Sequence, residues 1–155
     1  MAGYLHASDI ISGQEGKATA NINGSIETMF YIKSLEASLE KQKSEIHTLG
    51  HRGTQHKTTG WSGSGSMNLY YVSSIFRKLV KDYAKTGKDT YFTITVENDD
   101  PTSSIGKQTV VLYNCNLDSV VLAKLDVDNT ELDEDIEFTF EDFEILDTFK
   151  KPTTV

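Results

Sequence analysis

Four histidines and a single cysteine are the residues of this sequence best suited to bind a transition metal or to act as a nucleophile. Three of the histidines, His47, His51 and His56, lie close together in the chain. Zinc sites use histidine nitrogen and cysteine sulfur at characteristic spacings, which these three do not match, and no cysteine lies near them. We therefore predict no metal site here and expect histidines that are solvated or that lie in a contact with another molecule.

Cys115 is the only candidate for a nucleophilic thiol. It follows Val110, Val111 and Leu112 in a pattern typical of a buried strand, where a thiol stays protonated and unreactive. A lone cysteine also excludes a disulfide within the chain and is typical of a reducing compartment.

Carboxylates crowd residues 126–147, and the run 126–131 superficially resembles a calcium-binding loop. The run lacks the central glycine and the ligand spacing that such a loop needs, which favours an acidic solvated turn. No two carboxylates stand in visibly different surroundings, as a general acid and a general base must. We predict neither a catalytic site nor a cofactor, and we expect a protein that is not an enzyme.

The net charge of −8 argues against specific binding of nucleic acid, which needs basic patches to neutralise phosphates. Residues 1–96 hold 11 Lys or Arg and 8 Asp or Glu, whereas residues 97–155 hold 4 and 15. This split is typical of a solvated acidic surface, but it would also let the basic part of one copy meet the acidic part of another. No apolar run approaches the ~20 residues that cross a bilayer, and the start of the chain has no secretory signal pattern.

Alternating or β-branched runs dominate the sequence and predict an antiparallel β protein. Asn23-Gly24 follows the first run and predicts a tight hairpin. Residues 31–40 alternate apolar and polar side chains, which favours a strand, although a helical stripe through Ile32, Leu35 and Leu39 is the alternative. Further strands are expected over residues 17–22, 67–72, 91–97, 109–115, 120–127 and 137–146, the last with a bulge at Glu141-Asp142.

One amphipathic helix is expected over residues 74–86. Ser73 or Ser74 can cap its start, and Gly87 can end it. Its apolar face, predicted to pack on the sheet as core, consists of Phe76, Leu79, Val80 and Tyr83. Residues 1–155 are thus expected to form a single mainly β domain, an antiparallel β-sandwich or partly closed barrel flanked by one α-helix.

Residues 42–65 lack a periodic pattern and are rich in Gly, Ser, Thr and His. A long structureless segment in a compact domain is usually a functional loop or a flexible linker. Ile46, Leu49 and Trp61 are apolar anchors that a linker would not need. We predict a long mobile loop that becomes ordered against another molecule.

Several segments, in order along nearly the whole chain, resemble one family. They include the run His56-Lys57-Thr58-Thr59-Gly60 and the run Phe138-Thr139-Phe140-Glu141-Asp142-Phe143. Together with residues 11–16, 40–52, 91–93 and 125–128, these runs resemble the XkdM-like tail-tube proteins of PBSX-type defective prophages. Trp61 and Glu137 depart from the pattern as local variation.

The resemblance implies a subunit with the tail-tube (Hcp-like) fold that catalyses nothing. Six copies of such a subunit form a ring, and rings stack inside the contractile sheath of a phage tail or an R-type bacteriocin. Its partners would be other copies of itself, the tail sheath, and baseplate and tail terminator proteins. It would be cytoplasmic in the producing cell before assembly and afterwards part of the virion or bacteriocin particle.

The predicted loop is the candidate assembly interface, through Lys41, Lys43, Gly50, Arg52, His56, Lys57, Thr58, Thr59, Gly60 and Trp61. Its basic residues are expected to face an acidic surface of a neighbouring copy, formed by Glu131, Asp133, Glu134, Asp135, Glu141 and Asp142. The alternative is a soluble β-sandwich binding module in which residues 42–65 are a recognition loop, and a small barrel enzyme is a third possibility.

Overall fold

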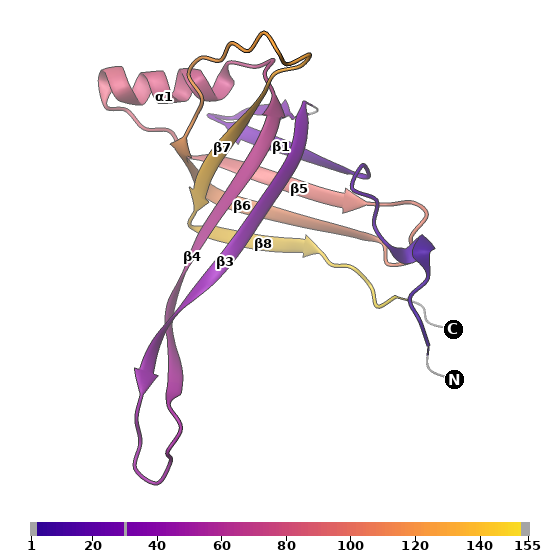
Figure 1. The fold of residues 1–155 in the computed structure, drawn as a ribbon, viewed down its shortest axis with the longest axis vertical. Coiled ribbons are helices and arrows are strands. Elements are labelled where there is room, and N and C mark those ends of the chain that lie inside the picture. Colours follow the sequence, from indigo (N-terminus) through magenta and orange to yellow (C-terminus); the bar gives the residue numbers. More distant parts are fainter. Residues whose placement is uncertain (1–2, 30, 153–155) are drawn as a thin grey trace.

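The structure, a computed structural model, describes residues 3–29 and 31–152. The described residues contain eight strands, one α-helix and one short 3-10 helix (Figure 1). In chain order the elements are η1 (Ala7–Asp9), β1 (Gly16–Ile22), β2 (Ser25–Thr28), β3 (Ile32–Ile46), β4 (Gln55–Tyr70), α1 (Ile75–Thr86), β5 (Phe92–Asp99), β6 (Lys107–Ser119), β7 (Asp133–Phe140) and β8 (Asp142–Asp147). The predicted class, mainly β and antiparallel with one helix, is confirmed.

The strands follow the order β2-β1-β5-β6-β7-β4-β3, with β8 paired to β6, and every pairing is antiparallel. β6 belongs to both halves, because its first part pairs with β5 and β8 and its last part pairs with β7. Asn114, with a φ of 53°, lies at the irregularity in β6 just before this change of partner. Such a bulge bends a strand, so the sheet folds over itself and its two halves cross in Figure 1.

The first hairpin forms where Asn23-Gly24 predicts it. Ile22 pairs with Ser25, and Asn23 and Gly24 have φ values of 53° and 83°. A two-residue turn with positive φ at both positions matches the twist of the flanking strands.

The structure corrects three of the predicted elements. Residues 42–65 are not a structureless loop, because β3 and β4 continue through them and leave only residues 47–54 unpaired between the strands. Residues 120–127 form no strand, since β6 ends at Ser119 and the chain then runs irregularly to Asp133. At Glu141 the chain passes from β7 to β8 and thus changes partners, instead of forming a bulge within one strand.

The core lies between the two halves of the folded sheet. Phe138, Met67 and Ile94 are among its fully buried side chains, and Cys115 is buried beside them. Gly63 pairs with Phe140 and Gly65 with Phe138 across β4 and β7. A Cβ at Gly63 would collide with the Phe140 ring, and one at Gly65 with the Phe138 ring and, at 2.8 Å, with the Glu36 carbonyl oxygen. The rings therefore need glycine at both positions.

The helix α1 is placed as predicted, but only its first two turns pack on the core. Gly87 ends it in a left-handed conformation with a φ of 76°. Phe76 is buried with its ring centre 5.8 Å from that of Phe92, and Leu79 is half-buried against the core. Val80 is also half-buried, whereas Tyr83 is 56 % exposed because the last turns of α1 extend beyond the sheet (Figure 1).

Arg77 ties α1 to the rest of the molecule. Its guanidinium forms an ion pair with the buried Glu134 carboxylate of β7, donates to the Ser73 carbonyl and lies over the Tyr71 ring at 4.4 Å. A third hydrogen bond, 3.4 Å long, reaches the Val121 carbonyl oxygen just after β6.

We expect Gly65→Ala to lower the free energy of unfolding by about 1–3 kcal/mol, the usual cost of overpacking a core. Gly13→Ala is the matched control, because nothing lies within 4 Å of a Cβ at Gly13. Urea unfolding of the monomeric protein measures both. Equal stability of the two variants would show that the Phe138 ring does not depend on a glycine beneath it.

Phe76→Ala should lower the free energy of unfolding by about 3–5 kcal/mol, because it empties a buried aromatic site between α1 and the sheet. Tyr83→Ala, on the exposed part of the same helix, should change it by less than about 0.5 kcal/mol. The same urea titration compares them. A large loss at Tyr83 and none at Phe76 would mean that the other face of the helix is packed.

Candidate assembly interface

Residues 41–59, which we call the arm, are the outer part of the β3–β4 hairpin. Every side chain of the arm is exposed, and Figure 1 shows the arm extending away from both halves of the sheet. Cross-strand pairing continues as far as Ile46 with Gln55. The alternation of the inner strands stops here because neither face of the arm covers a core, which explains why the sequence shows no periodicity.

An aromatic cluster marks the base of the arm. Trp61 lies opposite Lys41, and its ring centre is 6.1 Å from Phe140 and 5.7 Å from Phe143, the latter edge-on. Phe140 and Phe143 also meet edge-on at 6.5 Å. The tryptophan remains 38 % exposed, so it anchors the arm and still offers a surface to another molecule.

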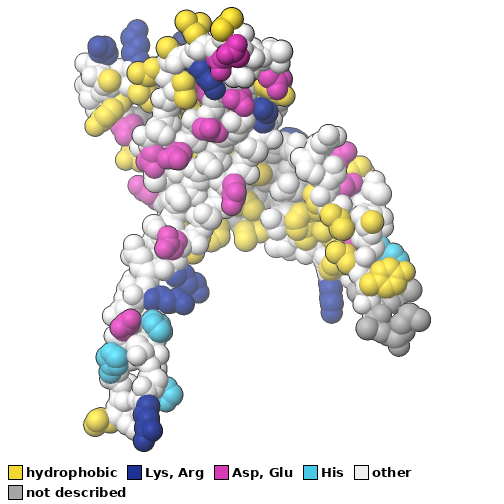
Figure 2. Space-filling view, viewed as in Figure 1, with side chains coloured by type: hydrophobic (Ala, Val, Ile, Leu, Met, Phe, Trp, Pro, Cys, Tyr) yellow, Lys and Arg dark blue, Asp and Glu magenta, His cyan; other side chains and the backbone are white. Residues whose placement is uncertain are grey.

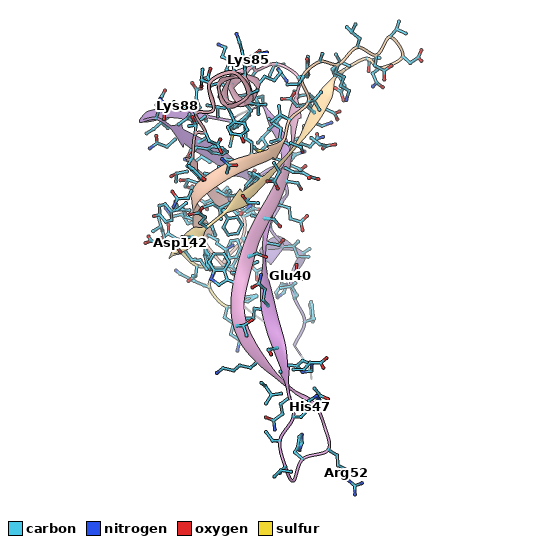
Figure 3. The ribbon with its side chains drawn as sticks, turned by 90° about the vertical axis from the view of Figure 1, so that its left-hand side faces the viewer. Glu40, His47, Arg52, Lys85, Lys88 and Asp142 are labelled. Atoms are coloured by element: carbon cyan, nitrogen blue, oxygen red, sulfur yellow. The ribbon has the colours of Figure 1, made fainter. Side chains whose placement is uncertain are left out.

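The arm is basic. It carries Lys41, Lys43, Arg52 and Lys57 against a single glutamate, Glu45. Among the ion pairs of the described residues, none involves an arm side chain. Figure 2 shows lysine, arginine and histidine side chains along the arm, while other lysine and arginine side chains lie at the upper end of the molecule. Figure 3 shows Arg52 pointing away from the tip of the arm, residues 47–54.

Eight of the ten predicted interface residues lie in the arm, and Gly60 and Trp61 lie at its base. Gly50 is in the tip with a φ of 81°, a conformation that favours glycine. His56 pairs with Glu45 across the strands, while His47 and His51 are in the tip. The described residues contain no group of three or more His, Cys, Asp or Glu side chains placed to hold a metal ion.

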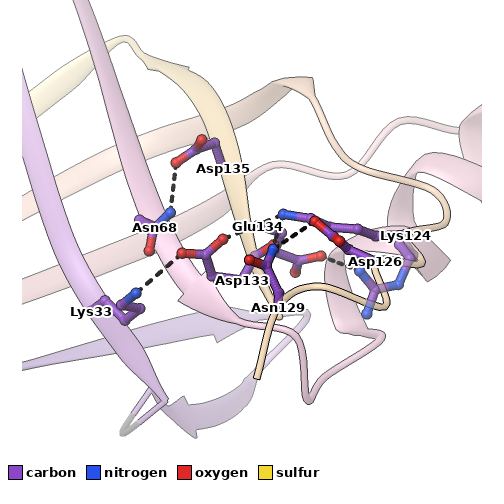
Figure 4. Close-up of polar contacts among 9 residues, drawn as sticks. Lys33, Asn68, Lys124, Asp126, Asn129, Asp133, Glu134 and Asp135 are labelled. Atoms are coloured by element: carbon purple, nitrogen blue, oxygen red, sulfur yellow. Dashed lines mark hydrogen bonds and ion pairs between the residues drawn. The ribbon is translucent and has the colours of Figure 1, made fainter. Parts of the chain in front are cut away.

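The six carboxylates predicted to face the arm do not form one surface. Asp133 is paired with Lys33 at 3.1 Å and Lys124 at 3.3 Å, and hydrogen bonds from these lysines hold its pKa below the usual value (Figure 4). Glu134 is buried against Arg77. The other four are exposed, but Glu141 and Asp142 lie at the β7–β8 junction. Figure 3 shows Asp142 level with the base of the arm.

Cys115 has the character that the sequence predicts. Its side chain is fully buried, its Sγ lies 3.5 Å from the Leu112 carbonyl oxygen, and burial raises its pKa to about 12. A thiol with this pKa carries almost no thiolate near neutral pH, so it is a poor nucleophile.

Sequence reasoning missed two surface features. The outward face of β3, β4 and β7 forms a shallow groove of about 370 Å³ lined by serines and by Glu36, Asp118 and Glu137. Residues 120–132 expose several large aliphatic side chains instead of burying them in a strand. The turn-forming residues Asp126, Asp128 and Asn129 were the signal against a strand there. Within the described residues, no helix is long and apolar enough to span a bilayer.

Solved structures with a similar fold come from contractile injection systems. A chain of the anti-feeding prophage tube-terminating cap has a TM-score of 0.70 over 94 % of this chain and 95 % of that one, at 9 % identity. A chain of the PVC sheath–tube complex in its extended state has a TM-score of 0.65 over 88 % and 90 %, at 10 % identity. At such low identity these matches show the fold alone.

Sequence similarity is closer to a prophage protein. The protein XkdM of the phage-like element PBSX of Bacillus subtilis (strain 168) is 46 % identical over 141 residues, which cover 91 % of this chain and 93 % of that protein. The family described as "Phage tail tube protein" matches residues 3–147. The resemblance read from the sequence is therefore confirmed, and the chain belongs to the phage tail tube protein family.

Proposed function

We propose that this chain is a structural subunit of the inner tube of a contractile phage tail or a phage-tail-like bacteriocin, and that it assembles with itself into stacked hexameric rings. The observation that supports the proposal most directly is that the arm extends from the domain with all of its side chains exposed. A two-stranded hairpin on its own is marginally stable in water, and the arm has no core of its own. Such a hairpin gains the burial that it lacks when another molecule packs against it.

The sheet edges support assembly from identical copies. Among the described strands, the order ends at β3, whose 15 residues pair on one side only, and at the short β2. An open edge of this length pairs readily with a strand of another chain. A contact between two different surfaces of the same subunit repeats from copy to copy and can close into a ring.

The outward face of β3, β4 and β7 suits the wall of an aqueous bore. Glu36, Ser66 and Glu137 lie side by side across these three strands, and Ser38, Ser64 and Thr139 form the next row. In this arrangement the bore would be polar and negatively charged, so it would not hold nucleic acid by its phosphates.

The other partners follow from the same proposal. Similar chains come from a sheath–tube complex, a baseplate and a tube-terminating cap. We accordingly place the tail sheath, baseplate and tail terminator proteins among its partners. The subunit would be cytoplasmic in the producing cell and then part of the assembled particle, without catalytic activity or cofactor.

We expect the concentrated protein to form tubes with six-fold symmetry in negative-stain micrographs. Arg52→Glu combined with Lys57→Glu should leave the circular dichroism spectrum unchanged but suppress the tubes, because the reversed arm charge would no longer suit its partner surface. Lys150→Glu with Lys151→Glu, an equal charge change outside the arm, is the control. A protein that stays monomeric at every concentration would support the binding module instead.

Hydrogen exchange should distinguish the free from the assembled arm. In the monomer, the amides of residues 41–59 should exchange orders of magnitude faster than those of β5, because no packing holds the arm closed. In tubes they should become protected, while β5 is protected in both states. Strong protection of the arm already in the monomer would contradict its proposed role.

A further inference from the structure

Residues 120–132, which we call the upper loop, join β6 to β7 and expose large aliphatic side chains. Leu122 is 69 % exposed, Leu125 98 % and Val127 97 %. Val72, 70 % exposed, lies near the end of the upper loop, because the Tyr71 amide donates to the Leu132 carbonyl oxygen at 2.9 Å. Exposed apolar side chains that gather in this way mark an interaction surface.

Hydrogen bonds hold the upper loop in place. The Asp126 carboxylate accepts from the Asp128 amide at 3.1 Å and from the Asn129 side chain at 2.8 Å. Lys124 Nζ donates to the Asp133 carbonyl oxygen at 2.7 Å (Figure 4), and Arg77 reaches the Val121 carbonyl oxygen. The aliphatic side chains are thus presented on a formed turn.

The charge of the upper loop is opposite to that of the arm. Its acidic residues are Asp126, Asp128 and Glu131, and its one basic residue, Lys124, is already paired with Asp133. Figure 2 shows acidic and hydrophobic side chains together at the upper end of the molecule. The lysines of α1, including Lys85, are at the same end but on the helix, as Figure 3 shows.

The arm tip and the strand ends next to it have a matching composition. Leu49 in the tip is fully exposed, Ile46 at the end of β3 is 38 % exposed, and Arg52 and Lys57 supply positive charge. The tip and the upper loop lie at opposite ends of the longest axis in both Figure 1 and Figure 3. A contact between complementary patches at opposite ends repeats in one direction without closing, as stacking requires.

We propose that the arm tip of one copy docks on the upper loop of a second copy that follows it along the tube. Leu49 covers Leu125 and Val127, and Arg52 and Lys57 face Asp128 and Glu131. The inference rests on the proposed function and replaces the acidic surface predicted from the sequence, of which only Glu131 belongs to the upper loop. Apolar burial supplies the affinity, and the charges set the direction.

A charge exchange tests the contact. The pair Asp128→Lys and Glu131→Lys spares Asp126, whose carboxylate holds the turn. We expect this pair, like Arg52→Glu with Lys57→Glu, to raise the critical concentration for assembly by ~10-fold or more, since like charges would then meet. A chain that carries all four substitutions should return to within about threefold of the parent, because each contact regains opposite charges.

Two further variants make the result specific. Glu141→Lys with Asp142→Lys, added to the arm pair, changes the charge equally but outside the upper loop and should not restore assembly. Leu125→Ser alone, at a side chain with no packing to lose, should also raise the critical concentration. Circular dichroism checks the fold of each variant, and sedimentation measures assembly.

The outcomes separate this inference from the function on which it rests. Normal assembly of the Asp128 and Glu131 pair, or of Leu125→Ser, would overturn the docking site while the tube function stood. Failure of the fourfold variant to recover, with its fold intact, would overturn the pairing. If the parent chain itself forms no tubes, the proposed function fails.

Discussion

In the β4–β7 pair, two phenylalanine rings occupy the space that side chains at Gly63 and Gly65 would take. This allows Phe138 to be fully buried in the middle of the core. It also brings Phe140 to Trp61, where the β3–β4 hairpin leaves the body. The pairs Gly63–Phe140 and Gly65–Phe138 thus contribute both to the core and to the base of the arm. The direction of the arm is therefore coupled to the packing of the domain.

The hairpin has two parts with opposite requirements. From Trp61 to its end at Tyr70, β4 turns glycine, methionine and leucine toward the core and serine toward solvent. In the arm, both faces are exposed and no burial offsets the entropy of ordering the chain. Packing within the domain therefore does not determine the sequence of the arm, which is consistent with the proposed element shared between copies.

The parts of the fold that depend on local backbone conformation or on one-sided burial can be predicted from the sequence. Asn23-Gly24 and Gly87 determine their turns by backbone conformation alone, and β5 shows its alternation because one face is buried. The arm, whose strands bury nothing, gives no periodic signal. Residues 120–127 mislead for the reverse reason, since several of their apolar side chains are exposed on the surface. Of the predicted interface carboxylates, Asp133 and Glu134 are engaged within the subunit, which only the arrangement of Lys33, Lys124 and Arg77 reveals.

The distribution of free charge bears on why assembly would have a direction. Inside the subunit, Asp133 and Glu134 of β7 are paired with lysine and arginine, so these two carboxylates contribute to its fold. At the two ends, the arm and the upper loop keep unpaired charge of opposite sign beside exposed leucines.

An exposed charge pair contributes little by itself and is screened by salt, and a single leucine buries little area. In the proposed ring, however, every copy would make the same contact at once, so contacts too weak to join two monomers would be sufficient to join two rings. Growth would then require ring closure first, which keeps single subunits free in solution until the closed ring presents all of its arms together.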